Sequence, residues 1–147
     1  MPPTLETDRM ILREPVQADF DAGWAEFHGD EDCMRYLGGP MPRSVAWRML
    51  AQCVGMWSLR GYGPFSAIEK ITGRWLGRVG PWEPEGWPER EVGWLFHRSA
   101  WGHGYATEAA KACLDYVFRD LAWSRVGHMI HPGNAPSQRV AERVGSV

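Results

Sequence analysis

The sequence predicts a single domain with a mixed α/β fold, and three observations lead to this prediction. The chain has 147 residues, the size of one domain with a substantial buried core. Its apolar and charged fractions, 44% and 23%, are ordinary for a globular protein. Its periodic segments follow the order β-α-α-β-β-β-α-β-α. Antiparallel strands followed by a late β-α-β crossover favour a mixed sheet over a doubly wound dinucleotide-binding fold.

Periodicity and chain breakers place the first five elements. Met10 and Leu12 alternate with polar residues, which is typical of a half-buried strand. Phe20, Trp24 and Phe27 recur at helical spacing. The resulting elements are a strand at 7–15, a helix at 17–29, a helix at 44–59 with Ser44 as its N-cap, and strands at 65–69 and 75–79.

The remaining elements contain the most informative segment. Residues 90–97 predict a strand whose alternate side chains, Glu91, Gly93 and Leu95, face away from Val92, Trp94 and Phe96. A strong apolar stripe predicts a helix at 107–121. A strand at 125–130 and a last helix from residue 135, capped by Asn134 and stopped at Gly145, complete the order.

Composition argues against several classes of function. The net charge of −2 is unlike that of a general nucleic-acid binder. The apolar runs are shorter than the roughly 20 residues that span a bilayer, and the N-terminus has no secretory apolar region. Three cysteines without a CxxC pair predict reduced thiols in the cytoplasm. The spacing of the histidines and cysteines predicts no metal site.

The loop between the strand at 90–97 and the following helix has the features of an anion site. Gly102 and Gly104 let the backbone approach a ligand, and Thr107 adds a hydroxyl in the first helical turn. Unpaired N–H groups and the helix dipole favour a phosphate there. The spacing alone is equally compatible with a plain glycine turn. A P-loop pattern is absent, and no carboxylate follows where a Rossmann fold would bind ribose.

Three ordered motifs resemble those of the GNAT acetyltransferases. They are EVGWLF at 91–96, WGHGYATEA at 101–109 and NAPSQRVAERVG at 134–145. The opening LETDRMILREP and the segment MRYLGG are similar to the branch of the ribosomal-protein N-terminal acetyltransferases RimJ and RimL. The resemblance covers nearly the whole chain, 1–147, and implies a largely antiparallel twisted sheet with flanking helices.

The resemblance implies that acetyl-CoA is the co-substrate. In the family, a loop of the form R/Q-x-x-G-x-G/A binds the pyrophosphate, and here Ser99 replaces the first residue of that pattern. The strand before the loop is expected to pair with the pantetheine arm. The implied cofactor-binding residues are Leu95, Phe96, His97, Trp101, Gly102, His103, Gly104, Tyr105, Ala106, Thr107, Asn134 and Ser137.

The implied reaction is direct attack of a primary amine on the acetyl thioester. Only a neutral amine attacks, and Glu91 occupies the strand position where many relatives have a general base. No tyrosine lies on the last helix, so Ser137 is the hydroxyl expected to protonate the leaving thiolate. The alternatives are a solvent-facing strand carboxylate for Glu91 and a backbone-bonded hydroxyl for Ser137.

The resemblance also implies a β-hairpin after the last helix, which the printed chain lacks. Without it, the strand at 125–130 would have an unpaired edge, covered by a second copy in a homodimer or left by truncation. The acceptor is a protein N-terminus or a small-molecule amine. A catalytically impaired CoA-binding or regulatory module and an enzyme with another acyl donor are the alternative functions.

Overall fold

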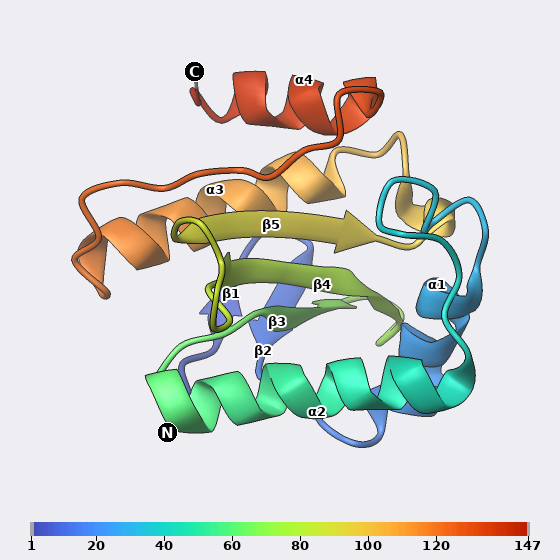
Figure 1. Ribbon diagram of the computed structural model, residues 1–147. Helices are drawn as coiled ribbons and strands as arrows, with labels where there is room; N and C mark the ends of the chain where they lie inside the picture. Colours follow the sequence, from blue (N-terminus) through green and yellow to red (C-terminus); the bar gives the residue numbers. More distant parts are fainter. Residues whose placement is uncertain (1, 147) are drawn as a thin grey trace.

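The computed structural model describes residues 2–146 and has a central sheet with helices on both faces (Figure 1). The elements, in chain order, are β1 (Leu5–Glu6), β2 (Met10–Arg13), η1 (Phe20–Trp24), α1 (Ala25–Gly29), α2 (Arg43–Arg60), β3 (Phe65–Glu69), β4 (Trp75–Trp82), β5 (Glu91–Phe96), η2 (Arg98–Ala100), α3 (Tyr105–Arg119) and α4 (Ala135–Arg143). The five strands follow one another as β1-β2-β3-β4-β5, and every neighbouring pair is antiparallel. The predicted mixed fold with a largely antiparallel sheet is therefore confirmed.

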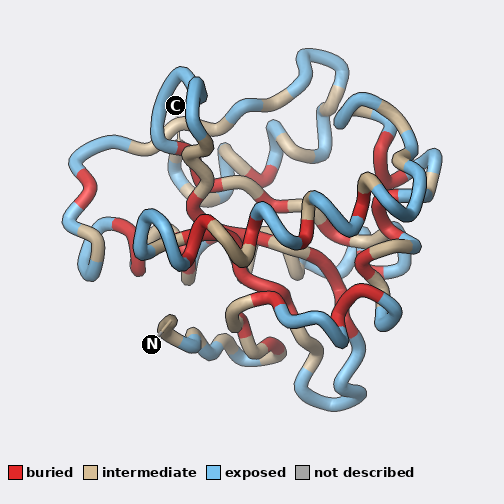
Figure 2. The backbone as a smooth tube through the Cα atoms, turned by 60° about the horizontal axis from the view of Figure 1, so that its bottom comes forward, coloured by how far each residue is buried: buried red, intermediate tan, exposed pale blue. Residues whose placement is uncertain are grey.

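Two apolar cores lie on opposite faces of the sheet. One includes Val92, Trp94 and Phe96 of β5 and is covered by α3 and α4. The other contains Trp24 and Trp75 and is covered by η1, α1 and α2. Figure 2 shows the buried residues concentrated along the sheet and the inner helix faces, with the connecting loops exposed. The predicted facing of the β5 side chains is confirmed, and β5 thus contributes to both sides of the molecule.

The predicted helix at 17–29 is broken into a π-helical turn, η1, and the short α1. Gly23 interrupts it with non-helical backbone angles. A Cβ at Gly23 would lie 2.7 Å from Cε3 of Trp75, so the chain bends where the indole packs against it. Asp19, which directly precedes η1, forms an ion pair with Arg13. The expected Ser44 cap is also absent, because α2 begins one residue earlier without a side-chain cap.

The predicted strand at 125–130 does not form. Gly127 makes a single parallel bridge to Glu91, and the two segments then lose their pairing. The reason is that side chains take the places of backbone partners. The Glu91 carboxylate accepts the Met129 N–H, and His128 Nδ1 donates to the Val92 carbonyl at 2.8 Å. The resulting separation opens space beside β5.

Candidate active site

The loop between β5 and α3 has the backbone geometry of an anion site. Gly102 and Gly104 both have φ of +79°, and a Cβ at Gly102 would meet open space. The glycine at 102 is thus required by backbone conformation rather than by crowding. None of the N–H groups of residues 102–107 donates a hydrogen bond to another described residue. These donors, at the N-terminus of a 15-residue helix, suit a phosphate group.

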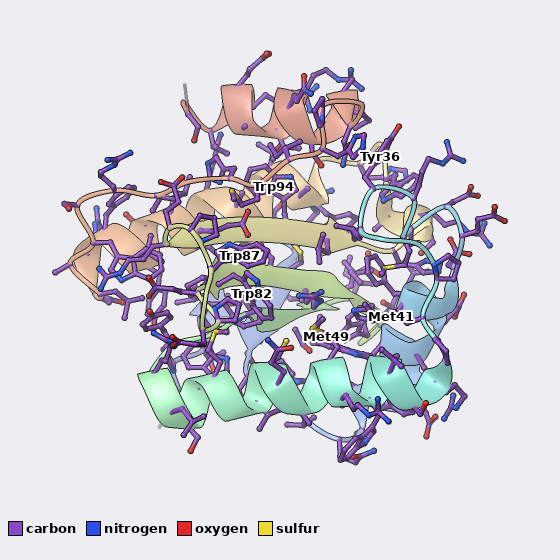
Figure 3. The ribbon with its side chains drawn as sticks, viewed as in Figure 1. Tyr36, Met41, Met49, Trp82, Trp87 and Trp94 are labelled. Carbon is purple, nitrogen blue, oxygen red and sulfur yellow. The ribbon has the colours of Figure 1, made fainter. Side chains whose placement is uncertain are left out.

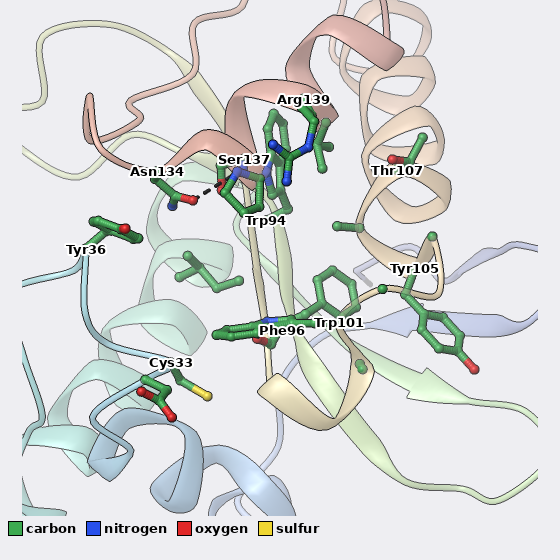
Figure 4. A pocket seen from close by; sticks show the side chains of 18 of the residues that line it. Cys33, Tyr36, Trp94, Phe96, Trp101, Tyr105, Thr107, Asn134, Ser137 and Arg139 are labelled. Atoms are coloured by element: carbon green, nitrogen blue, oxygen red, sulfur yellow. Dashed lines mark hydrogen bonds between the residues drawn. The ribbon is translucent and has the colours of Figure 1, made fainter.

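Thr107 provides an independent sign that the loop is built for a ligand. Its Oγ1 is buried and has no hydrogen-bond partner among residues 2–146. Thr107 lines a cavity of about 760 Å³, here called the loop cleft, which runs from the loop to α4 (Figure 4). A buried hydroxyl without a partner costs free energy, so an acceptor oxygen of a ligand would relieve this cost. The residues present therefore fit a pyrophosphate-bearing cofactor.

Contacts with the N-terminal strands hold the loop in place. Glu108 accepts hydrogen bonds from the Thr7 hydroxyl and from the backbone N–H and Nε of Arg9. The Arg9 guanidinium lies 4.0 Å from the centre of the Tyr105 ring, whose hydroxyl donates to Glu69. The Tyr105 side chain points away from the rest of the loop cleft (Figure 4). The side chain thus anchors the loop, and Tyr105 is also among the residues that line the cleft.

The electrostatics of Glu108 agree with an anchoring role. Burial raises the pKa of this carboxyl, but the hydrogen bonds from Thr7 and Arg9 outweigh burial and lower the pKa overall. Glu108 is therefore ionised at neutral pH and holds both partners. No local pattern in the sequence points to this role of Glu108, because Thr7 and Arg9 lie 101 and 99 positions away in the chain.

The outer edge of β5 is open beside the loop cleft. Val92 uses this edge to bond Gly127, and by strand alternation the backbone groups of Trp94 and Phe96 point the same way. The Phe96 carbonyl accepts the Trp101 indole N–H at 2.8 Å. The residues whose backbone groups face this open edge are thus Trp94 and Phe96, whereas the sequence predicted Leu95, Phe96 and His97 for the pairing. The backbone N–H and carbonyl of Leu95 point toward β4, and the His97 N–H donates to the Leu76 carbonyl.

Two predicted binding residues do not line either cleft with their side chains. The His97 imidazole lies 3.1 Å from Glu26 and 2.8 Å from the Ser99 hydroxyl. His103 is exposed, with its ring 6.4 Å from that of Tyr105. The structure brings the other predicted cofactor-binding residues to the wall of the loop cleft: Leu95, Phe96, Trp101, Gly102, Gly104, Tyr105, Ala106, Thr107, Asn134 and Ser137.

A second cavity, of about 400 Å³, adjoins the loop cleft on the α2 side of β5. It is here called the aromatic cleft, because indole and thioether side chains form much of its wall (Figure 3). Gly80 of β4 and Gly93 of β5 face each other in register and leave part of its floor without side chains. The residues shared by both clefts are Tyr36, Leu37, Trp94, Leu95, Asn134 and Ser137.

Asn134 and Ser137 lie where the two clefts meet. The Asn134 side chain accepts the Ser137 N–H at 3.3 Å and caps α4, as expected (Figure 4). The Ser137 hydroxyl donates no hydrogen bond to a described residue. It is therefore free to interact with a group at the junction.

Glu91 lies in the aromatic cleft, as the strand alternation predicts. Its side chain is close to the bridge with Gly127, and the residue is 7% exposed. Burial raises the pKa of this carboxyl and outweighs the Met129 hydrogen bond and the charge of Arg78, which lower it. A carboxylate with a raised pKa is better matched to accepting a proton near neutral pH.

Arg78 is a functional candidate that the sequence analysis missed. It lies on β4 opposite Leu95 and lines the aromatic cleft. Its Nε–H donates to Nε2 of His28 at 3.3 Å. His28 Nδ1 contacts the Trp24 carbonyl at 2.7 Å, so Nδ1 carries the proton and Nε2 is the acceptor. Burial, with the nearby charge of Arg78, lowers the pKa of His28 to about 3.

The three cysteines are buried free thiols. Cys33 borders the loop cleft, but burial raises its pKa to about 12. Burial likewise raises the pKa of Cys53 to about 11 and that of Cys113 still further. Protonated thiols are poor nucleophiles, so this site has no cysteine suited to forming an acyl-enzyme.

Comparison with known proteins identifies the family. A family model described as the acetyltransferase (GNAT) domain matches residues 9–147. This chain belongs to the GNAT acetyltransferase family. The GNAT fold explains the open edge of β5 and the loop before α3, and GNAT proteins use acetyl-CoA. The chain is thus an acyltransferase.

Individual relatives support this assignment. The chain is 38% identical to the uncharacterized protein YkkB of Bacillus subtilis (strain 168), over 96% of this chain and 83% of that protein. It is 34% identical to an acetyltransferase of Agrobacterium tumefaciens str. C58, with a TM-score of 0.89 over 97% of this chain and 82% of that one. RimL, a ribosomal L7/L12 alpha-N-protein acetyltransferase, shares the fold at 16% identity, with a TM-score of 0.78 over 97% and 80% of the two chains.

Within residues 2–146, no helix combines the length and apolar character needed to cross a bilayer.

Proposed function

We propose that this chain is an acetyl-CoA-dependent N-acetyltransferase that acetylates a primary amine by direct attack in a ternary complex. The observation that carries the proposal is the meeting of the loop cleft and the aromatic cleft at Leu95 and Ser137. Donor and acceptor can then approach one point from two sides. The proposal treats residues 1–147 as one domain acting in the cytoplasm, alone or as a homodimer.

The loop cleft is the donor side of this site. The N–H groups of residues 102–107 and the Thr107 hydroxyl bind the pyrophosphate. The outward backbone groups of Trp94 and the Phe96 N–H pair with the pantetheine arm, since the Phe96 carbonyl already accepts the Trp101 indole N–H. Acetyl-CoA supplies an activated acetyl group as a thioester. The protein holds this group at the junction and excludes water from it.

Glu91 and Ser137 handle the protons. A bond forms between the amine nitrogen and the acetyl carbon, and the carbon–sulfur bond breaks. Glu91, directly or through a water molecule, takes the proton that the amine loses and releases it to solvent. The Ser137 hydroxyl gives a proton to the leaving thiolate and regains one from solvent. Its position at the junction and its lack of a described acceptor support this role.

The acceptor is a protein N-terminus or a small-molecule amine. The structural likeness to RimL favours a RimJ/RimL-like N-terminal substrate. The aromatic cleft, of about 400 Å³, favours a small acceptor or the first residue of a chain.

Thermal unfolding with acetyl-CoA tests the donor side. A ligand that binds only the native state stabilises it by about 2.7 kcal/mol at a concentration 100 times its Kd. We expect stabilisation by acetyl-CoA, but not by NAD or ATP, and acetylation of amines in a following screen. Binding without turnover on any amine would instead indicate a CoA-binding module. Absence of stabilisation in a folded sample would contradict the proposal.

A matched pair of glycine variants makes this test specific. Gly102→Ala and Gly73→Ala both place a side chain at positive φ, +79° and +75°, with no atom within 4 Å of the new Cβ. Each variant should lose stability by about 1–2 kcal/mol. Only Gly102→Ala should weaken acetyl-CoA binding, by about tenfold or more, because Gly73 lies in the β3–β4 turn. If both variants weakened acetyl-CoA binding equally, the assignment of residues 102–107 as the pyrophosphate site would be wrong.

A further inference from the structure

We propose that the acceptor is an amine that also carries a carboxylate, as a free amino acid does, and that the Arg78 guanidinium binds this carboxylate. The inference rests on the proposed function and deepens it, since it names the substrate class of the same site. It draws on the position of Arg78, on its unpaired charge and on the apolar wall around it.

Contacts on three sides fix the position of Arg78. Its Nε–H donates to His28, and its guanidinium carbon lies 5.6 Å from the ring centres of both Trp24 and Trp82. In the sheet it lies between Ser66 of β3 and Leu95 of β5. Leu95 lines both clefts, and neighbouring strands are about 5 Å apart. The guanidinium therefore lies beside the junction where the amine would react.

The charge of Arg78 has no partner in the part of the chain from residue 2 to 146. It forms no ion pair there, and only its Nε donates a hydrogen bond. Arg13 provides a contrast, because both of its Nη atoms bind the Asp19 carboxylate, at 2.9 and 3.0 Å. The two Nη groups of Arg78 are thus available to a carboxylate, which guanidinium binds in a two-pronged manner.

The groups that face Arg78 do not neutralise it. His28 is neutral, because its pKa is lowered to about 3. The Cys53 thiol of α2 is protonated, because burial raises its pKa to about 11. Glu91 is the only carboxyl that lines the aromatic cleft among the described residues, and burial disfavours its charge. Burial also lowers the pKa of Arg78, but a guanidinium with an ordinary pKa above about 12 stays charged.

The rest of the aromatic cleft suits an apolar side chain. Trp82, Trp87, Met41 and Met49 contribute to its wall between the sheet and α2 (Figure 3). An unpaired cation in this cleft repels a second cation, so a polyamine is a poor ligand. A peptide N-terminus has an uncharged carbonyl where a free amino acid has its carboxylate. An apolar amino acid thus matches the anion-binding group and the wall together.

Matched acids and amides test this inference. The probes are L-methionine, L-leucine and L-phenylalanine with their primary amides as acceptors, and the corresponding N-acetyl acids and amides as ligands in the presence of CoA. We expect kcat/KM at least thirtyfold higher for the acids. Calorimetry should show the same preference among the N-acetyl ligands, which makes this readout independent of turnover. Equal binding of acids and amides, or binding of neither, would overturn the inference.

Substitutions of Arg78 test whether its guanidinium causes the preference for acids over amides. Arg78→Met should reduce the acid-to-amide ratio to within about threefold of one, and Arg78→Lys should keep part of it. Arg48→Met, which changes an exposed arginine of α2, is the matched control and should keep the full ratio. An unchanged ratio in folded Arg78→Met would refute the assignment. If that variant does not fold, the acid and amide comparison in the unmodified protein decides.

The two levels of the proposal can fail separately. If acetyl-CoA does not stabilise the unmodified protein, the proposed acetyltransferase function itself is wrong. Stabilisation by acetyl-CoA together with equal acetylation of amides and peptide N-termini would remove only the carboxylate specificity.

Discussion

The loop cleft and the aromatic cleft share six residues but are built in different ways. The phosphate-binding end of the loop cleft relies on the backbone of one contiguous segment, 100–107, and on the glycines that shape it, whereas segments at 27–37, 94–96 and 134–143 complete the walls. The aromatic cleft relies on side chains from α2, β4, β5 and the segments at 34–41 and 128–137. The phosphate-binding end of the donor side is thus a local structure, whereas the acceptor side exists only when distant segments have assembled. A substitution can therefore impair one cleft and leave the other intact, or it can impair both.

The largest effect should come from Gly77→Ala, which disrupts both clefts. A Cβ at Gly77 would lie 2.2 Å from the Leu95 carbonyl oxygen and 2.8 Å from the Phe96 Cα, so backbone atoms would have to move. We expect a loss of stability of about 3 kcal/mol or more in denaturant unfolding. Gly55→Ala, in the interior of α2 with open space around it, is the control and should stabilise by about 0.5–1 kcal/mol. If Gly77→Ala and Gly55→Ala were equally stable, the close approach of β4 and β5 at Gly77 would be contradicted.

Glu91→Gln should separate chemistry from binding. Removing a general base costs about 100-fold or more in rate, so kcat for a small amine should fall by about that factor at neutral pH. The ascending limb of the pH–rate profile due to Glu91 should disappear, and the limb due to the acceptor amine should remain. Acetyl-CoA binding should not change. A normal profile in the variant would exclude Glu91 as the base.

The same variant has a signed effect on the pH dependence of stability. The raised pKa of Glu91 means that the native state holds its proton more tightly than the unfolded chain does. Stability is therefore lost as pH rises from the unfolded pKa of about 4.3 through the raised native pKa. Glu91→Gln should remove this loss, so the difference in stability between variant and parent should grow in the variant's favour over that range. Denaturant unfolding at several pH values measures it.

Gly93→Val should affect the aromatic cleft alone. A Cβ there would meet only the Glu91 carboxyl carbon, at 4.0 Å, so the larger side chain would extend into the cavity without a backbone clash. We expect kcat/KM for the acceptor to fall by about tenfold, with the acetyl-CoA Kd changed less than twofold. Calorimetry and steady-state kinetics measure the two effects. A matching loss of acetyl-CoA binding would show that the clefts are not separable at this position.

The contrast between the clefts also explains how much the sequence could predict. The glycine turn at 102 and 104 and the Asn134 cap depend on neighbours in sequence, and their local patterns are enough to predict them. The helix that follows the glycines begins at Tyr105, two residues before its predicted start at residue 107. The alternation of β5 correctly placed Glu91 on the face opposite Val92, Trp94 and Phe96. His97 and His103 were included because they lie inside the motif, and their side chains turn away from both clefts.

Other features depend on contacts that no local pattern contains. The segment 125–130 has the composition of a strand, but Glu91 and His128 occupy its pairing positions. Arg78 looks like an ordinary polar residue of a half-buried strand until His28 and Trp82 are seen beside it. Its lack of an ion pair is a property of the assembled sheet and helices.

The contact of Glu108 with Thr7 and Arg9 has a consequence for the order of folding. These residues are 101 and 99 positions apart, so the contact closes a loop that contains most of the chain. Contacts of such long range form slowly, because chain entropy opposes them until other elements have assembled. During synthesis the first strands emerge long before the helix that completes their hydrogen bonds. A ligand bound at this loop should then prolong the lifetime of the finished protein by slowing unfolding, and leave its rate of folding unchanged.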